Sequence, residues 1–246
     1  MNIRATCLLD DAKFELSSAI LLYAKKSGYS RSQLCFASIH DVEIHAGTPR
    51  IKPGMAVAKS ALVEALKQLT PDEYVQAELL AENVLAKGHD HLVWYMYPTK
   101  RQVWFNCKEL GNVSAQTEQP GLVFVVKQNQ WHVFAIKGNE RPTPETPLYV
   151  APYFNVWEGG HICIGNVDLP KGEMKHNTEA WEECFFRSYF THPNVHDKGG
   201  LTKYRGGIFA LWRALMKGRA FPVTSLVPAD ETLSDVFERL VKHGRS

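Results

Sequence analysis

Four strand-like segments between residues 91 and 137 constrain the fold of this chain more than any other feature. They are HLVWYMY, RQVWFNC, GLVFVVK and WHVFAIK, all rich in β-branched and aromatic residues. The connections PTK, within the first pair, and QNQ, within the second, are too short for helical crossovers and suit hairpins. The centre of the chain is therefore predicted to be an antiparallel meander.

Apolar residues at helical spacing predict two helices before this meander. Residues 62–69 form the first, and the second is predicted to start at Thr70, where Glu73 completes a capping-box pattern. This second helix should end at Gly88.

The chain after the meander begins with an extended segment and continues with helices. Four prolines within residues 141–152 remove backbone donors and favour an edge-like path. A helix is predicted to start at Asn177 and Thr178, and a final helix should span about 231–243, with its apolar residues on one side.

The first fifty residues contain short β-like runs that end at Gly28 and Gly47. We therefore predict a β-rich N-terminal extension with one helix over residues 1–69 and a main domain over 70–246. The predicted class is α+β, with an antiparallel meander flanked by helices.

Composition excludes several classes of function. The 246 residues include 45% hydrophobic residues, enough for a real core. Lys and Arg exceed Asp and Glu by only two and no run of like charges gathers them, so direct nucleic-acid binding is not expected. Charged residues interrupt the apolar N-terminal patch, which argues against a signal sequence or a membrane span and predicts a cytoplasmic protein.

The five cysteines are odd in number, widely spaced and without a C-x-x-C pair. This pattern argues against a disulfide framework and against a zinc ribbon. Cys7, Cys35, Cys107 and Cys184 are expected to be reduced core thiols. We expect no cofactor and no metal, because the histidines of GHDHL and the pair His40 and His45 lack a third placed ligand.

The stretch PYFNVWEGGHICIGN places Cys163 in a segment that resembles a loop. Asn155 precedes Cys163 by eight residues, Gly160 follows Asn155 by five, and GHIC supplies a Gly-x-Ile-Cys sequence. A thiol in such a glycine-flanked loop can be reached by a large reactant, whereas a cysteine in a strand is usually a small buried hydrophobe. Both interpretations of Cys163 stay open on residue type alone.

This order of parts resembles the ubiquitin-conjugating enzyme fold. In that family an asparagine of a His-Pro-Asn motif precedes the catalytic cysteine of a Gly-x-Ile-Cys sequence by eight residues, the spacing of Asn155 and Cys163. Tyr153 and Phe154 replace the family's His and Pro, and Gly165 and Asn166 stand where an acidic residue is common.

More closely, TPLYVAPYFNVWEGGHICIGN and FFRSYFTHPN resemble the prokaryotic conjugating-enzyme-like family known as PRTRC system protein B. Recognisable pieces run from roughly residue 90 to residue 220. The resemblance implies a ThiF-like activating enzyme and a ubiquitin-like protein as partners. A JAB-type isopeptidase and a ParB-related protein are further partners that it suggests.

The chemistry of thioester transfer assigns roles to several residues near Cys163. The thiolate of Cys163 would attack a thioester, and the amide of Asn155 could stabilise the oxyanion that forms when an amine attacks, an effect of roughly 3 kcal/mol. Asp168, Glu158 and His161 are within sequence range to accept the amine's proton. Asn155 could instead terminate a strand by hydrogen bonding its own loop.

A literal His192-Pro193-Asn194 follows Cys163 by 29 residues. One interpretation is a helix that ends at Phe190, followed by a proline turn. The other is that His192 or Asn194 folds back over Cys163 and supplements the site.

We therefore predict a carrier enzyme, a transferase that accepts a ubiquitin-like protein as a thioester on Cys163 and passes it to an amine. One alternative is a non-catalytic adaptor of the same fold that binds a ubiquitin-like or ParB-related partner. A third is a cysteine hydrolase with Cys163 and His161 or His192 as a dyad, although no local sequence specifies an orienting third group.

Overall fold

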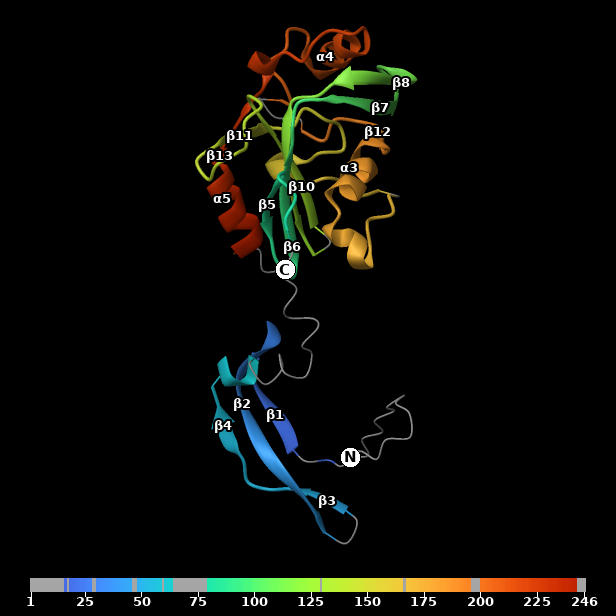
Figure 1. The fold of residues 1–246 in the computed structure, drawn as a ribbon. Helices are drawn as coiled ribbons and strands as arrows, with labels where there is room; N and C mark the ends of the chain where they lie inside the picture. The colour runs from blue at the N-terminus through green and yellow to red at the C-terminus, as the bar shows by residue number, and fades with distance from the viewer. Residues whose placement is uncertain are drawn as a thin grey trace. The chain divides into compact units, whose positions relative to one another are not determined.

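The computed structural model describes residues 16, 18–27, 30–45, 48–58, 60–63, 79–128, 130–165, 167–195 and 200–242, without the side chains of 24–27, 30–35, 173 and 174. The chain divides into two compact units, residues 1–79 and 80–246 (Figure 1). The domain boundary predicted after residue 69 lies outside the described residues, as do Cys7 and the side chain of Cys35.

The N-terminal unit is built around a long antiparallel hairpin. Strand β1 (Ser18–Ser27) pairs with β2 (Ser30–His45), and β3 (Thr48–Ile51) and β4 (Met55–Val57) also pair with β2. This confirms the predicted β-rich N-terminal region. Residues 60–63 are helical, and the rest of the first predicted helix lies outside the described residues.

The second predicted helix is wrong over its described part. Residues 70–78 lie outside the described residues, but Val84–Lys87 form strand β5, which pairs antiparallel with β6 (His91–Met96). Gly88 does not end a helix but begins the connecting turn, where its N–H donates to the carbonyl of His91 at 3.0 Å. Pairing with a neighbouring buried strand outweighs the local helical pattern here.

The C-terminal unit is centred on a six-stranded sheet in the order β13-β11-β10-β9-β6-β5. The further strands are β9 (Gly121–Lys127), β10 (Gln130–Ile136), β11 (Pro147–Val150) and β13 (Pro228–Thr232), and each adjacent pair is antiparallel. The predicted α+β class with an antiparallel sheet and helices is confirmed.

One of the four predicted strands belongs to a second sheet. β7 (Lys100–Cys107) pairs with β8 (Gly111–Glu118) and, in parallel, with β12 (Tyr189–Phe190), while β6 pairs directly with β9. Sequence analysis missed β8 because GNVSAQTE is polar and carries little of the apolar alternation that indicates a strand.

Helices cover both faces of the large sheet. Helix α3 (Thr178–Phe186) begins where predicted, with the Asn177 side chain accepting from the Ala180 N–H at 3.1 Å. It ends at Phe186 rather than Phe190, because Tyr189 and Phe190 pair with β7. The final helix is confirmed as α5 (Leu233–Phe237), capped by Thr232 and continued as a π-helix over Glu238–Lys242.

Sequence analysis did not predict helix α4 (Gly207–Met216). Short 3-10 turns occupy Glu158–Gly160, Gly172–His176 and Val223–Ser225. None of the helices in the described ranges is both long and apolar enough to cross a membrane.

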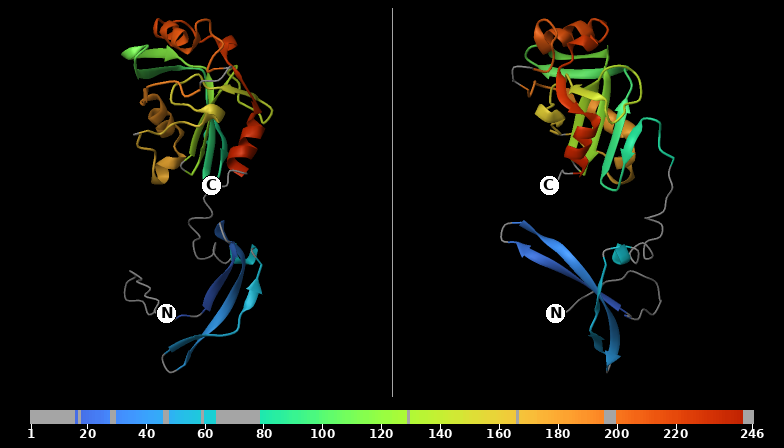
Figure 2. Two further views of the ribbon diagram at one scale, coloured as in Figure 1. Left: turned by 180° about the vertical axis from the view of Figure 1, so that it is seen from behind. Right: turned by 90° about the vertical axis from the view of Figure 1, so that its left-hand side faces the viewer.

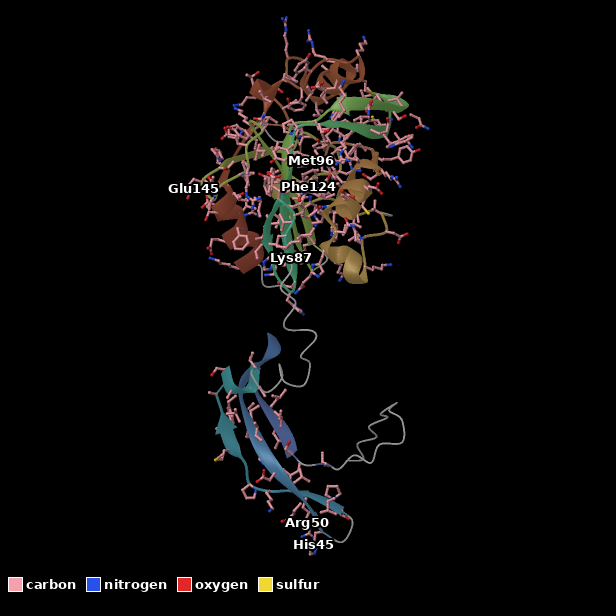
Figure 3. The ribbon with its side chains drawn as sticks, viewed as in Figure 1. His45, Arg50, Lys87, Met96, Phe124 and Glu145 are labelled. Carbon is pink, nitrogen blue, oxygen red and sulfur yellow. The ribbon has the colours of Figure 1, made fainter. Side chains whose placement is uncertain are left out.

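Strand alternation divides the core into two clusters. One side of the sheet, including Met96 and Phe124 (labelled in Figure 3), packs with residues of α3 and α4. The other side packs with α5 through Leu233 and Val236. Figure 2 shows α3 and α5 on opposite sides of the sheet, and the segment between β11 and α3 carries Cys163.

Candidate functional site

Residues 155–163 form a narrow loop with two antiparallel arms. The Cys163 N–H donates to the Asn155 carbonyl at 2.7 Å, and the Trp157 N–H donates to the His161 carbonyl at 2.7 Å. The Ile162 N–H donates to the carbonyl of Trp131 in β10 at 2.8 Å, which attaches the second arm to the sheet. The rigid sheet therefore positions the backbone of Cys163.

Only glycine fits at position 160. Gly160 has a φ of 84°, and a Cβ there would lie 2.6 Å from Cζ of Phe134 and 2.9 Å from the Val133 carbonyl. A left-handed backbone and direct contact with β10 are both tolerated because glycine has no side chain. This close approach explains the glycine of the Gly-x-Ile-Cys sequence.

Alternation along the second arm sends the Cys163 thiol outward. Val156 and Ile162 are buried, whereas Cys163 is exposed and its thiol is free. The interpretation of Cys163 as a buried core thiol is therefore wrong. Cys107, by contrast, is half-buried and packs against the core, in line with its prediction.

Tyr153 and Phe154, which replace the family's His and Pro, anchor the loop from inside the domain. Both are fully buried, and the Tyr153 hydroxyl donates to Oε1 of Gln119 at 2.6 Å. Burial raises the pKa of Tyr153 well above its ordinary value, so this hydroxyl is a structural donor and not an acid. The two aromatic residues thus support the site without reaching its surface.

Cys163 opens onto a pocket of about 920 Å³. Its walls come from the loop after Cys163, from one face of α3 and from the segment around β12. The lining residues are Asn155, Cys163, Ile164, Gly165, Val167, Asp168, Pro170, Lys171, Ala180, Glu183, Cys184, Arg187, Ser188, Tyr189, Thr191 and His192.

Asn155 joins the two halves of this pocket. Its Nδ2 donates to the Tyr189 carbonyl at 2.7 Å, and its Oδ1 accepts from the N–H and the hydroxyl of Thr191 at 3.2 and 3.0 Å. Its backbone N–H donates to the carbonyl of His192 at 3.1 Å. An asparagine suits this position because its φ of 61° lies in the left-handed region, which asparagine tolerates.

The other candidates of the sequence analysis fall into two groups. Asp168 and His192 line the pocket with Cys163. His161 and Asn194 are not among the lining residues, since His161 lies against His132 with ring centroids 5.2 Å apart and Asn194 is buried.

Two further residues named in the sequence analysis also lie apart from the pocket lining. Glu158 is exposed on the 3-10 turn that ends at Gly160, and Asn166 lies outside the described residues.

Cys184 is half-buried and packs against the core, as predicted, but it also lines the pocket. Its Sγ donates to the Asp168 carbonyl at 3.4 Å. Burial raises the pKa of this thiol, and the nearby Glu183 and Asp168 carboxylates raise it further. Cys184 is therefore held as a thiol, the less reactive form.

Sequence analysis missed the contribution of Tyr189 and Thr191. The signal was present in FFRSYFTHPN, which contains the His-Pro-Asn triplet, but the contact depends on β12 pairing with β7. That pairing brings residues 189–192 alongside Asn155, 34 residues earlier in the chain.

Comparison with models of protein families identifies the family to which this chain belongs. The model for prokaryotic E2 family D matches residues 58–229. The chain belongs to this family. Searches of curated proteins and of solved structures found no match.

Membership of prokaryotic E2 family D confirms the predicted resemblance to ubiquitin-conjugating enzymes. The match includes Asn155, Cys163 and the whole pocket, and it begins after β4, so strands β1 to β4 lie outside it. Affiliation with PRTRC system protein B within this kind of protein stays a prediction.

Proposed function

We propose that this prokaryotic E2 family D protein carries a ubiquitin-like protein as a thioester on Cys163 and transfers it to an amine. The observation that carries the proposal is the exposed Cys163 thiol. It lies at the rim of a large pocket, on a loop held by the sheet, eight residues after an asparagine that hydrogen bonds across that pocket.

Loading is a thiol exchange. The Cys163 thiolate attacks the carbonyl carbon of a thioester held by a cysteine of the activating enzyme. A new carbon–sulfur bond forms, the old one breaks, and the activating enzyme's sulfur leaves as a thiolate that takes up the proton lost by Cys163. The exchange is nearly isoenergetic, so access to Cys163 matters more than a strongly lowered pKa.

Transfer is an aminolysis. The amine attacks the carried thioester, an amide bond forms, Cys163 leaves as a thiolate, and the amine gives up a proton. Asp168 and His192 both line the pocket and are the acceptors that we propose. Asn155 Nδ2 uses one N–H on the Tyr189 carbonyl, and the second N–H is the donor that we propose for the oxyanion.

The partners that we propose are a ThiF-like activating enzyme and a small ubiquitin-like protein. A JAB-type isopeptidase would remove the conjugates, and a ParB-related protein would act in the same system. Family membership supports an enzyme of the conjugating kind. A dyad hydrolase receives no support, because within the described ranges no imidazole nitrogen hydrogen bonds the Cys163 thiol.

The test is to incubate the protein with its activating enzyme, ATP and the ubiquitin-like protein, and to separate the products without reductant. We expect a covalent adduct that disappears on thiol reduction. Cys163→Ser should abolish it or convert it to a reduction-resistant ester, while the matched variant Cys184→Ser keeps it. Loss of the adduct in Cys184→Ser but not in Cys163→Ser would refute the proposal. Tight binding of the ubiquitin-like protein without any adduct would also refute it and would favour an adaptor.

A further inference from the structure

Residues 200–229 concentrate positive charge. They contain Lys203, Arg205, Arg213, Lys217 and Arg219 and no acidic residue. Without these five, the chain has 23 basic and 26 acidic residues. The small net charge of the whole chain therefore conceals one strongly basic segment.

The fold gathers these cations around helix α4. Arg213, Lys217 and Arg219 line a pocket of about 570 Å³ at the C-terminal end of the helix. Nη1 of Arg219 donates to the Tyr204 hydroxyl at 2.9 Å, which brings the neighbours of Tyr204 beside the pocket.

The turn between β7 and β8 adds a sixth cation. Nη2 of Arg213 donates to the Glu109 carbonyl at 2.6 Å, and the adjacent Lys108 is exposed. Nitrogen-tipped side chains project from the end of the domain where α4 lies (Figure 3). We name this set the basic surface: Lys108, Lys203, Arg205, Arg213, Lys217 and Arg219.

The two faces of α4 differ in chemistry. Leu211, Trp212 and Leu215 are buried, and Nε1 of Trp212 donates to the Pro152 carbonyl at 3.1 Å. The outer face combines cations with the small side chains of Ala210 and Ala214. Within the described part of α4, no large apolar side chain is exposed, so this face lacks the apolar anchor of a typical protein interface.

Helix electrostatics explain only part of this arrangement. A cation near a helix C-terminus is stabilised by about 0.3–1 kcal/mol, which accounts for Arg213 and Lys217. It does not account for Lys108, Lys203 or Arg205, which lie on the flanking segments. Their convergence suits a ligand with several negative charges.

We propose that the basic surface binds the phosphate backbone of duplex DNA without reading its sequence. A regular array of phosphates matches cations spread over several segments and needs no apolar anchor. A single strand would need aromatic rings free to stack on bases. Tyr204, Phe209 and Phe221 are half-buried and Trp212 is buried, which favours a duplex.

The test uses the full-length protein and a fluorescein-labelled 20-base-pair DNA of arbitrary sequence, with anisotropy followed over a salt series. We expect a Kd of about 10⁻⁴ to 10⁻⁶ M near physiological salt and a linear fall of log K with log salt. The double variant Arg205→Gln, Lys217→Gln should flatten that slope by about 1.8, or about 0.9 for each phosphate that it no longer neutralises. A melting curve checks that it folds.

The matched control is Lys137→Gln, Lys175→Gln, which removes the same charge from exposed lysines outside the basic surface. It should keep the wild-type slope and affinity. The proposal is overturned if the control loses as much binding as the test variant, or if no salt-dependent binding occurs at low ionic strength. Tighter binding of a matched RNA duplex, or binding of polyglutamate but not DNA, would overturn it in favour of those partners.

Discussion

Replacement of Asn155 by alanine tests the site most directly, because this side chain hydrogen bonds across the pocket. Asn155→Ala removes three hydrogen bonds, one to the Tyr189 carbonyl and two from Thr191. It also places alanine at a φ of 61°, where asparagine is better tolerated. Both effects weaken the attachment of residues 189–192 to the Cys163 loop.

The magnitude follows from these hydrogen bonds. A net hydrogen bond contributes about 0.5–1.5 kcal/mol, so three contribute about 2–4 kcal/mol. The left-handed backbone adds about 1 kcal/mol for alanine. Since about 1 kcal/mol shifts the Tm of a domain of this size by 2–4 °C, we expect Asn155→Ala to melt at least about 6 °C below the wild type.

Two further variants separate the causes. Asn155→Gly loses the same hydrogen bonds without the backbone cost, and should be about 1 kcal/mol more stable than Asn155→Ala. Thr191→Val removes the hydroxyl that donates to Asn155, together with the 2.9 Å hydrogen bond between that hydroxyl and Nδ1 of His192. A double-mutant cycle with Asn155→Ala isolates the shared hydrogen bond and should show a coupling of about 0.5–3 kcal/mol. Chemical denaturation of the five proteins, the wild type, the three single variants and the double variant, measures both quantities.

Single-turnover kinetics, run well below the Tm of each variant, test the catalytic role of Asn155. Loading should remain within a few-fold of wild type, and discharge onto free lysine should slow by about 10² to 10³ if its amide stabilises the oxyanion. Discharge at the wild-type rate would remove Asn155 from the chemistry. Equal defects in loading and discharge would make its role structural, and an unchanged Tm would refute the hydrogen-bond argument itself.

Three further predictions concern reactivity, packing and pH. When alkylation by iodoacetamide is followed by peptide mass spectrometry, the exposed Cys163 should be the fastest thiol to react. Cys184 should react more slowly because burial raises its pKa, and comparable rates would contradict this. Gly160→Ala should cost about 3 kcal/mol in a denaturation curve, whereas Gly159→Ala, also at positive φ but with its nearest neighbour 3.9 Å from a Cβ, should cost about 1 kcal/mol; equal losses would refute the predicted clash. Burial, with smaller effects from neighbouring charges, lowers the pKa of His132 from 6.5 to about 4, so the unfolded state binds more protons between these values. The free energy of unfolding should have its full value above pH 6.5 and fall by roughly 3 kcal/mol as the pH drops through 4. His132→Gln should reduce this loss, and an identical pH profile for the variant would contradict the assignment.

Local patterns were sufficient for much of the fold and for singling out the loop of Cys163, the nucleophile that we propose. The apolar strands β6, β9 and β10, the start of α3 at its Asn177 cap and the final helix follow from periodicity and capping, which depend on neighbours in the chain. The spacing of Asn155, Gly160 and Cys163 is likewise a local pattern, because one short loop contains all three residues. Family membership and the exposed thiol agree with that interpretation.

Tertiary structure decided which of two plausible local states each ambiguous segment adopts. Val84–Lys87 continue a helical pattern in the sequence but form a strand, because pairing with β6 satisfies their backbone and buries Val84. Tyr189 and Phe190 leave the helical pattern of α3 because β7, more than eighty residues earlier, offers them backbone partners. That long-range pairing carries Thr191 and His192 to the Cys163 pocket, and no local signal contains it. Likewise, the sequence contains every residue of the basic surface, but the packing of α4 against the β7–β8 turn and the contact of Arg219 with Tyr204 bring them together.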